Sequence, residues 1–151
     1  MAVQRAGPDP DDEPLPPLPP APASVTHSLP ATADSVGRLR RAVADFATRH
    51  GASDSSLEAL NLAVSEALTN VVVHAYRNEV APGPVLVLVT LSDGAVIVTV
   101  ADEGCGLTPR SDSPGLGLGM GLMARLADTF EVTPRAARPG MELRMRFALT
   151  G

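Results

Sequence analysis

Cysteine and long apolar runs are both scarce in this sequence. Cys105 is the only cysteine among 151 residues, so no disulfide can form within the chain and nothing points to an oxidising compartment. No apolar run approaches the roughly 20 residues that a membrane-spanning helix requires, and the N-terminus lacks the apolar core of a signal peptide. We therefore expect a cytoplasmic protein that does not enter a membrane.

Positive charge is also in short supply. The chain has 12 Lys and Arg residues against 17 Asp and Glu, which gives a formal net charge of -5. A surface that binds nucleic acid or an anionic membrane needs clustered basic side chains to displace counterions. The composition argues against both kinds of partner and leaves proteins and small molecules.

Proline is unevenly distributed. Eight of the 15 prolines lie between Pro8 and Pro22, mixed with acidic residues. Such a stretch has too little apolar surface to offset the conformational entropy that is lost on ordering. We expect residues 1–22 to form a disordered acidic tail with no assigned function, and residues 23–151 to form one domain of ordinary size.

Hydrophobic periodicity predicts three helices. Apolar residues recur at the 3.6-residue period over residues 33–50, and a second helix carries the same pattern over residues 54–75. The third helix is expected to begin inside the glycine run 115–121 and to continue to Phe130. It follows a loop at residues 107–114 that is rich in Pro and Ser.

Five strands are predicted around these helices, at residues 24–29, 85–91, 95–101, near Val132 and at 143–149. Asp93-Gly94 is a strong hairpin signal, so the second and third strands should pair antiparallel. Pro139-Gly140 predicts the turn before the last strand. The expected fold class is α+β: a two-layer sandwich with the helices packed on one face of a mixed, mostly antiparallel sheet.

The second helix carries a polar row besides its apolar stripe. Glu66 and Asn70 are i and i+4 neighbours, and His74 lies one turn further on. Mg²⁺ prefers hard oxygen ligands such as the Asn70 amide oxygen, and Glu66 can orient or deprotonate a group that attacks a phosphate. A solvated helix face is the alternative interpretation. Asn, however, lowers helix propensity by several tenths of a kcal/mol, which favours a specific use.

The segment Asp102-Glu-Gly104-Cys-Gly106 follows the third strand. A plain turn leaving a strand would use the same residue types. In a functional interpretation, the Asp102 carboxylate accepts a hydrogen bond from an adenine amino group, and the glycines let base and sugar approach the backbone. Cys105 is then a small filler rather than a redox group.

Four glycines alternate at positions 115, 117, 119 and 121, directly before a helix. Inside a helix each costs up to about 1 kcal/mol relative to Ala, so packing alone does not explain them. Free N–H groups at a helix N-terminus bind anions, and glycines let phosphate oxygens come close. The chain has neither a P-loop sequence nor the βαβ context of a Rossmann fingerprint.

In this order and at these separations, the three segments resemble the N-box and the two glycine boxes of the GHKL ATPase superfamily. The resemblance covers about residues 24–149. It is closest to the single-domain anti-sigma-factor serine/threonine kinases, because Glu66-Ala-Leu-Thr-Asn-Val-Val-Val-His-Ala-Tyr76 is very similar to their N-box. There is no room for a histidine-bearing dimerisation helix pair or for topoisomerase domains.

The resemblance implies an ATP-binding regulator that uses Mg²⁺. Glu66 would be the general base of serine phosphorylation, Asn70 the magnesium ligand and Asp102 the adenine-recognising residue. The partners implied are a sigma factor and an anti-anti-sigma protein of the STAS type, with homodimer formation left open. The implied nucleotide-binding residues are Asn70, His74, Arg77, Asp102, Gly104, Gly106, Leu107, Gly115, Gly117, Leu118, Gly119 and Met120.

Some features depart from that family. Many relatives have Gly-Thr at the start of the last strand, whereas Gly140 here is followed by Met141, which predicts a lowered ATP affinity. Arg77 could neutralise phosphate, and His74 could contact it, but a surface role explains each equally well. Two other functions stay open: a nucleotide-dependent switch that sequesters a sigma factor without kinase activity, and a protein-binding module with a degenerate ATP pocket.

Overall fold

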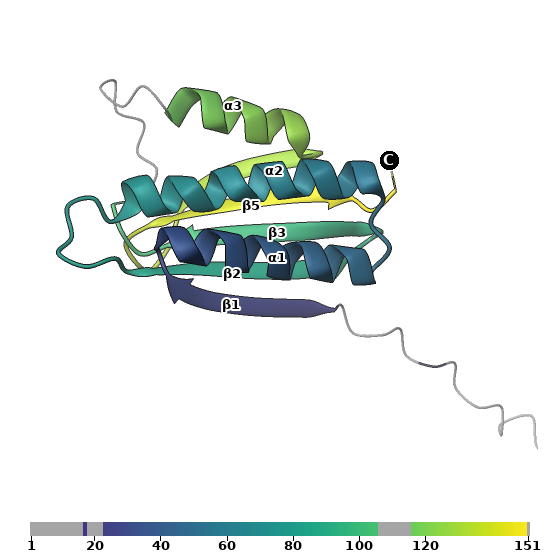
Figure 1. The fold of residues 1–151 in the computed structure, drawn as a ribbon, viewed down its shortest axis with the longest axis horizontal. Coiled ribbons are helices and arrows are strands. Elements are labelled where there is room, and N and C mark those ends of the chain that lie inside the picture. The colour runs from purple at the N-terminus through teal and green to yellow at the C-terminus, as the bar shows by residue number, and fades with distance from the viewer. Residues whose placement is uncertain (1–16, 18–22, 106–115, 151) are drawn as a thin grey trace, which may run out of the picture.

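A five-stranded sheet with helices on one face forms the core of this computed structural model, which describes residue 17 and residues 23–105 and 116–150 (Figure 1). The elements run in the order β1 (Ser24–Pro30), α1 (Ala33–Arg49), α2 (Asp54–Asn70), the π-helical turn η1 (Val71–Ala75), β2 (Pro84–Ser92), β3 (Ala95–Asp102), α3 (Leu116–Leu126), β4 (Thr129–Pro134) and β5 (Met141–Ala148). The two-layer α+β sandwich is confirmed. The predicted tail, apart from Pro17, and the predicted loop at 107–114 lie outside the described residues.

The sheet has the strand order β1-β2-β3-β5-β4, and every neighbouring pair is antiparallel. The β2–β3 hairpin closes at Asp93 and Gly94, whose φ angles of 47° and 68° lie in the left-handed region. Two successive residues with positive φ define the type I′ turn that Asp-Gly predicts. This turn sets a register in which Val85, at the start of β2, faces Asp102, at the end of β3.

The core lies between the sheet and the helices. Side chains alternate across a strand, and in β2, β3 and β5 most of those facing the helices are buried, whereas most on the opposite face are at least partly accessible. α1 and α2 meet this face with apolar stripes at helical spacing, as the periodicity predicted. The fully buried large side chains include Leu39, Val43, Leu60, Val64, Leu68, Val85, Val87, Val89, Val96, Val98, Met123 and Met145.

The predicted third helix is too long at its C-terminal end. α3 stops at Leu126, and Phe130 belongs to β4, where it pairs with Met145 of β5. Asp128 makes the break: its N–H donates to the Arg146 carbonyl, and its Oδ2 accepts from the Ala148 N–H. These bonds to a distant strand outweigh the helical spacing of the apolar residues.

The end of α2 also differs from a simple continuation. Residues 71–75 form a π-helical turn. Such turns are uncommon in proteins, but those that occur are often found at functional sites. The carbonyl of Ala75 then accepts the N–H of Cys105 at 2.8 Å. As a result the end of α2, the end of β3, the start of α3 and the loop before β5 lie at the same end of the molecule, on the left in Figure 1.

Among the residues that the structure describes, no helix is both long and apolar enough to cross a membrane.

Candidate functional site

Asn70 is the last residue of α2, and its side chain is buried rather than solvated. It is 5% exposed, and within the described residues its Nδ2 atom has no hydrogen-bond partner. A buried amide donor without a partner costs about 1–3 kcal/mol, and such groups are rare in native structures. The alternative of a solvated helix face is therefore wrong for Asn70, which has the properties of a group that a ligand completes.

Glu66 lies one turn before Asn70 and is half-buried. Gly119 of α3 lies directly against it, because a Cβ at position 119 would overlap a Glu66 carboxylate oxygen. A Cβ on Gly121, in contrast, would meet no atom within 4 Å. The glycine run thus contributes one position where a side chain is excluded by the predicted general base.

Asp102 is the last residue of β3 and is 1% exposed. Its Oδ1 accepts the N–H of Gly104 at 3.0 Å, which closes a turn of the kind that Asp favours. A Cβ on Gly104 would overlap the carbonyl oxygen of Ala75. The turn after β3 therefore crosses the end of η1 at a distance that only glycine allows.

Tyr76 holds this crossing from the other side. Its hydroxyl accepts the N–H of Glu103 at 2.8 Å and donates to the carbonyl of Pro84. Its ring packs so closely on Gly83 that a Cβ there would overlap it. Burial raises the pKa of the Tyr76 phenol above its ordinary value of 10.0, and the nearby Asp102 and Glu103 charges raise it further, while the bond from the Glu103 backbone lowers it.

The loop between β4 and β5 closes the same turn. Gly140 has a φ of 114°, and a Cβ there would overlap the carbonyl oxygen of Asp102. Arg135 donates to that carbonyl at 3.3 Å and lies 3.5 Å from the Glu103 carboxylate. Arg138 adds a second, more exposed ion pair to Glu103 at 3.4 Å. The backbone around Asp102 is thus held by three other segments of the chain: residues 75–76, the start of β2 and the loop between β4 and β5.

Sequence reasoning did not identify Tyr76, Glu103 or Arg135. Tyr76 is the only tyrosine of the chain and follows the polar row directly, so its hydroxyl was a signal that could have been used. Arg135 follows β4 in a loop of ordinary composition. Its contact with Asp102 depends on strand pairing, and the sequence offers no local sign of it.

The other predicted site residues are less closely gathered. His74 is half-buried, and its carbonyl accepts a contact from the Cys105 thiol at 3.3 Å. Arg77 is exposed, as is Leu118, whereas Met120 is half-buried against the core. Gly117 lies in α3. The remaining three, Gly106, Leu107 and Gly115, lie outside the described residues.

No group of three or more His, Cys, Asp or Glu residues suited to a metal ion occurs within 23–105 and 116–150. A protein-only metal cage is therefore not present in that part of the chain. A Mg²⁺ ion held mainly by phosphate and water needs few protein ligands, and the buried Asn70 amide fits that limited requirement.

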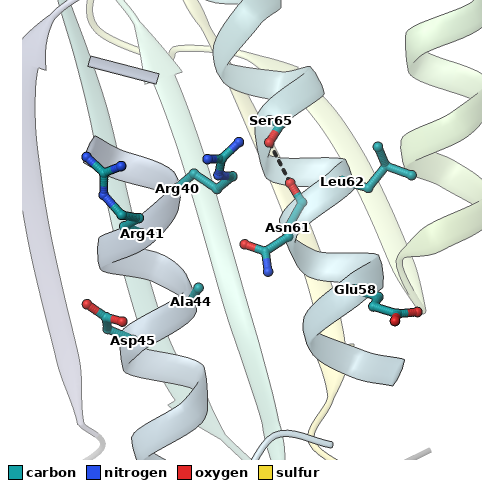
Figure 2. Close-up of a pocket in the computed structure, with 8 residues that line it drawn as sticks. All are labelled: Arg40, Arg41, Ala44, Asp45, Glu58, Asn61, Leu62 and Ser65. Carbon is teal, nitrogen blue, oxygen red and sulfur yellow. Dashed lines mark hydrogen bonds between the residues drawn. The ribbon is translucent and has the colours of Figure 1, made fainter. Parts of the chain in front are cut away.

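A separate groove of about 630 Å³ lies between α1 and α2, away from these residues. Figure 2 shows Arg40, Arg41 and Asp45 on one wall and Glu58, Asn61 and Leu62 on the other. The hydroxyl of Ser65 donates to the Asn61 carbonyl at 2.7 Å. None of the predicted site residues lines this groove.

Comparison with known proteins agrees with the motif reading. Serine-protein kinase RsbW of Bacillus thuringiensis (strain Al Hakam) is 29% identical over 123 residues, which are 72% of this chain and 76% of that protein. The RsbW of Bacillus mycoides (strain KBAB4) matches to the same extent.

Two solved structures share the fold. The RsbU and RsbW domains of Rv1364c from Mycobacterium tuberculosis superpose with a TM-score of 0.66 at 23% identity, over 84% of this chain and 32% of that one. The histidine kinase domain of the Erythrobacter litoralis EL346 blue-light activated histidine kinase superposes with a TM-score of 0.53 at 24% identity, over 80% of this chain and 62% of that one.

The family model described as "Histidine kinase-like ATPase domain" matches residues 29–147, which span every element from the end of β1 into β5. The GHKL resemblance of the three sequence segments is thereby confirmed. This chain belongs to the histidine kinase-like ATPase domain family.

Proposed function

We propose that this chain is an ATP-binding regulatory protein that acts as an anti-sigma factor with serine/threonine kinase activity. The observation that carries the proposal is the pairing of two buried polar groups at one end of the fold: the Asp102 carboxylate and the Asn70 amide, whose Nδ2 has no partner. Both are costly to bury for packing alone. A nucleotide with a base at one end and phosphates at the other needs two such groups.

Asp102 is suited to recognise the base. A carboxylate accepts hydrogen bonds only, so it selects a donor such as the exocyclic amino group of adenine. At 1% exposure the bond would be little weakened by water. The close backbone contacts of Gly104 and Gly140 hold the end of β3 in place. An acceptor that is preorganised in this way loses less entropy on binding.

Asn70 is suited to the phosphate end. Rotation of its amide presents either nitrogen or oxygen, and the oxygen is a Mg²⁺ ligand. When bound, the ion would neutralise phosphate charge. His74 and Arg77 follow Asn70 and would face the same anionic group, while the N–H groups near the start of α3 would donate to phosphate oxygens.

Glu66 is proposed as the general base. It lies one helical turn from Asn70, so a serine hydroxyl brought to the terminal phosphate would be within reach of its carboxylate. Glu66 would take the hydroxyl proton as the oxygen attacks. The serine must come from another protein, and we propose a STAS-type anti-anti-sigma protein as its source and a sigma factor as the second partner, in the cytoplasm.

Transfer of labelled phosphate from ATP to candidate anti-anti-sigma proteins tests this proposal. Glu66→Gln should lower the transfer rate at least about a hundredfold while ATP still binds, because general-base catalysis contributes that much. Glu58→Gln, an exposed change in the same helix, is the matched control and should transfer normally. If Glu66→Gln transferred phosphate as fast as the wild type, Glu66 would not be the base.

A nucleotide-dependent switch that sequesters a sigma factor without phosphorylation is the second candidate. It is favoured by the close contact of Gly119 with Glu66, which covers the carboxylate that a kinase would expose to its substrate. The phosphate-transfer assay distinguishes the two functions, because the switch binds ATP and the sigma factor but transfers no phosphate to any partner.

A further inference from the structure

The phenol of Tyr76 joins three segments that are far apart in the sequence. Its hydroxyl donates to the Pro84 carbonyl at the start of β2 and accepts the N–H of Glu103 directly after β3, while its own backbone follows η1. A phenol is both donor and acceptor, so it satisfies both partners at once. Phenylalanine would fill the same space and satisfy neither.

The ring is as tightly placed as the hydroxyl. A Cβ on Gly83 would overlap it, and a Cβ on Gly104 would lie 3.1 Å from the ring atom Cδ1. Glycines on both sides therefore let the ring lie between the segment before β2 and the turn after β3. With the ring confined in this way, the hydroxyl keeps one position relative to the Glu103 peptide.

The position of that peptide governs the Asp102 side chain. The Glu103 N–H belongs to the peptide group that follows Asp102, and the next N–H, that of Gly104, donates to the Asp102 carboxylate at 3.0 Å. A rotation of the first peptide would carry the second donor with it. The hydroxyl of Tyr76 is thus hydrogen-bonded to the residue directly before the one whose N–H orients the carboxylate.

We propose that Tyr76 is a positioning residue of the adenine site: it holds the Asp102 carboxylate in a fixed position relative to the end of the helix that carries Asn70. The inference rests on the proposed ATP binding and deepens it. Tyr76 does not touch the nucleotide in this account. It acts on base recognition through Asp102, and it ties the base end of the site to the phosphate end.

The affinities for two nucleotides distinguish this positioning role from a general contribution to stability. Inosine triphosphate has the same phosphates and ribose as ATP but lacks the 6-amino group from which Asp102 would accept a hydrogen bond. Tyr76→Phe should weaken ATP binding about tenfold, the loss of one well-placed hydrogen bond, and leave inosine triphosphate binding nearly unchanged. Calorimetric titration of the full chain with each magnesium nucleotide measures both.

The dependence on Asp102 is tested by a double-mutant cycle. Once Asp102→Ala has removed the acceptor, adding Tyr76→Phe should weaken ATP binding by less than about twofold, because interacting residues are not additive. Ser65→Ala removes another hydroxyl bonded to a backbone carbonyl and should leave both nucleotides unaffected. Equal losses for both nucleotides in Tyr76→Phe, or full additivity with Asp102→Ala, would overturn the positioning role.

A spectroscopic signal covers the case in which Tyr76→Phe does not fold. Tyr76 is the only tyrosine and the chain has no tryptophan, so near-ultraviolet absorbance and fluorescence of the wild type report this phenol with little interference. Bound ATP should change the surroundings of the turn, and with them the Tyr76 emission, more than bound inosine triphosphate does. Identical emission with both nucleotides would contradict the proposal, whereas no binding of either would contradict the ATP-binding function itself.

Discussion

The turn after β3 and the groove between α1 and α2 are built in opposite ways. Around Asp102 the backbone is so crowded that Gly104 and Gly140 cannot carry a side chain, and Asn70 nearby is buried with an unpaired donor. The groove has a volume of about 630 Å³, and charged side chains such as Arg41, Asp45 and Glu58 are exposed there.

This difference shows that the volume of a surface groove does not by itself indicate specific ligand recognition. Exposed charges in the groove are already solvated, so they gain little from a ligand that replaces water. A buried amide such as that of Asn70 has lost its water, and a ligand that supplies a hydrogen bond regains that energy. Close backbone approaches further fix where the groups point. The crowded region around Asp102 is therefore the better candidate for recognition of a small molecule.

Alanine at Gly104 should have the largest effect on this contrast. The added Cβ would overlap the Ala75 carbonyl, and neither backbone can move without breaking the bond between Cys105 and Ala75. We expect a loss of about 3 kcal/mol of stability, together with loss of ATP binding. Thermal unfolding and calorimetric titration measure the two effects.

Gly37→Ala is the matched control on α1, where the nearest atom to the new Cβ is 3.8 Å away. It should raise stability by about 0.5–1 kcal/mol, because Ala loses less backbone entropy than Gly in a helix. A Gly104→Ala protein as stable as Gly37→Ala would show that the turn is not crowded as described.

Removal of the Asn70 amide should separate binding from stability. Since its Nδ2 makes no hydrogen bond in the protein, Asn70→Ala loses no such bond from this atom, and we expect a stability change within about 1 kcal/mol. ATP affinity should fall about tenfold to a hundredfold. Asn61→Ala, in the same helix but on the groove, should leave both quantities close to wild type. Equal ATP affinities for the two variants would contradict the site.

Alanine at Gly119 tests the contact of α3 with Glu66. The new Cβ would overlap a carboxylate oxygen at the end of a flexible side chain, so Glu66 can move aside and stability should change by less than about 1 kcal/mol. Phosphate transfer should fall because the base is displaced. Gly121→Ala, with open space around its Cβ, should keep wild-type transfer rates, and similar rates for both variants would argue against Glu66 as the base.

The smallest effect is expected from pH. The pKa of Tyr76 is raised in the folded protein, so the neutral phenol stabilises the fold below pH 10.0, and this contribution is lost as the pH rises through the higher folded pKa. Unfolding midpoints measured across the alkaline range should fall less steeply for Tyr76→Phe than for the wild type. The same slope in both proteins would mean that the phenol is not in the buried environment described.

Sequence patterns predicted the parts of this fold that depend on neighbours in the chain. Helical spacing gave α1 and α2, and Asp93-Gly94 gave the β2–β3 hairpin, because these signals act over a few residues. Phe130 was assigned to a helix because its spacing continued the pattern of α3. Only the bonds from Asp128 to β5 decide otherwise, and they join residues that are distant in sequence.

The candidate site shows the same difference between local signals and contacts that join distant parts of the sequence. The motif residues Asn70, Asp102 and Gly104 were predicted from spacing and resemblance, but their burial was not, since it depends on how the helices pack on the sheet. Tyr76 and Arg135 reach the turn only through tertiary contacts. The sequence thus predicted which groups are candidates for the site, and the structure adds how they are held.

The central claim is that a buried acceptor and a buried amide form an ATP site at this end of the fold. Isothermal titration of the full chain with magnesium ATP tests it most directly, with Asp102→Asn measured alongside. The account predicts a one-to-one complex for the wild type and at least about a tenfold weaker one for Asp102→Asn. A folded wild-type protein that gave no binding heat at millimolar ATP, or an Asp102→Asn protein that bound equally well, would contradict it.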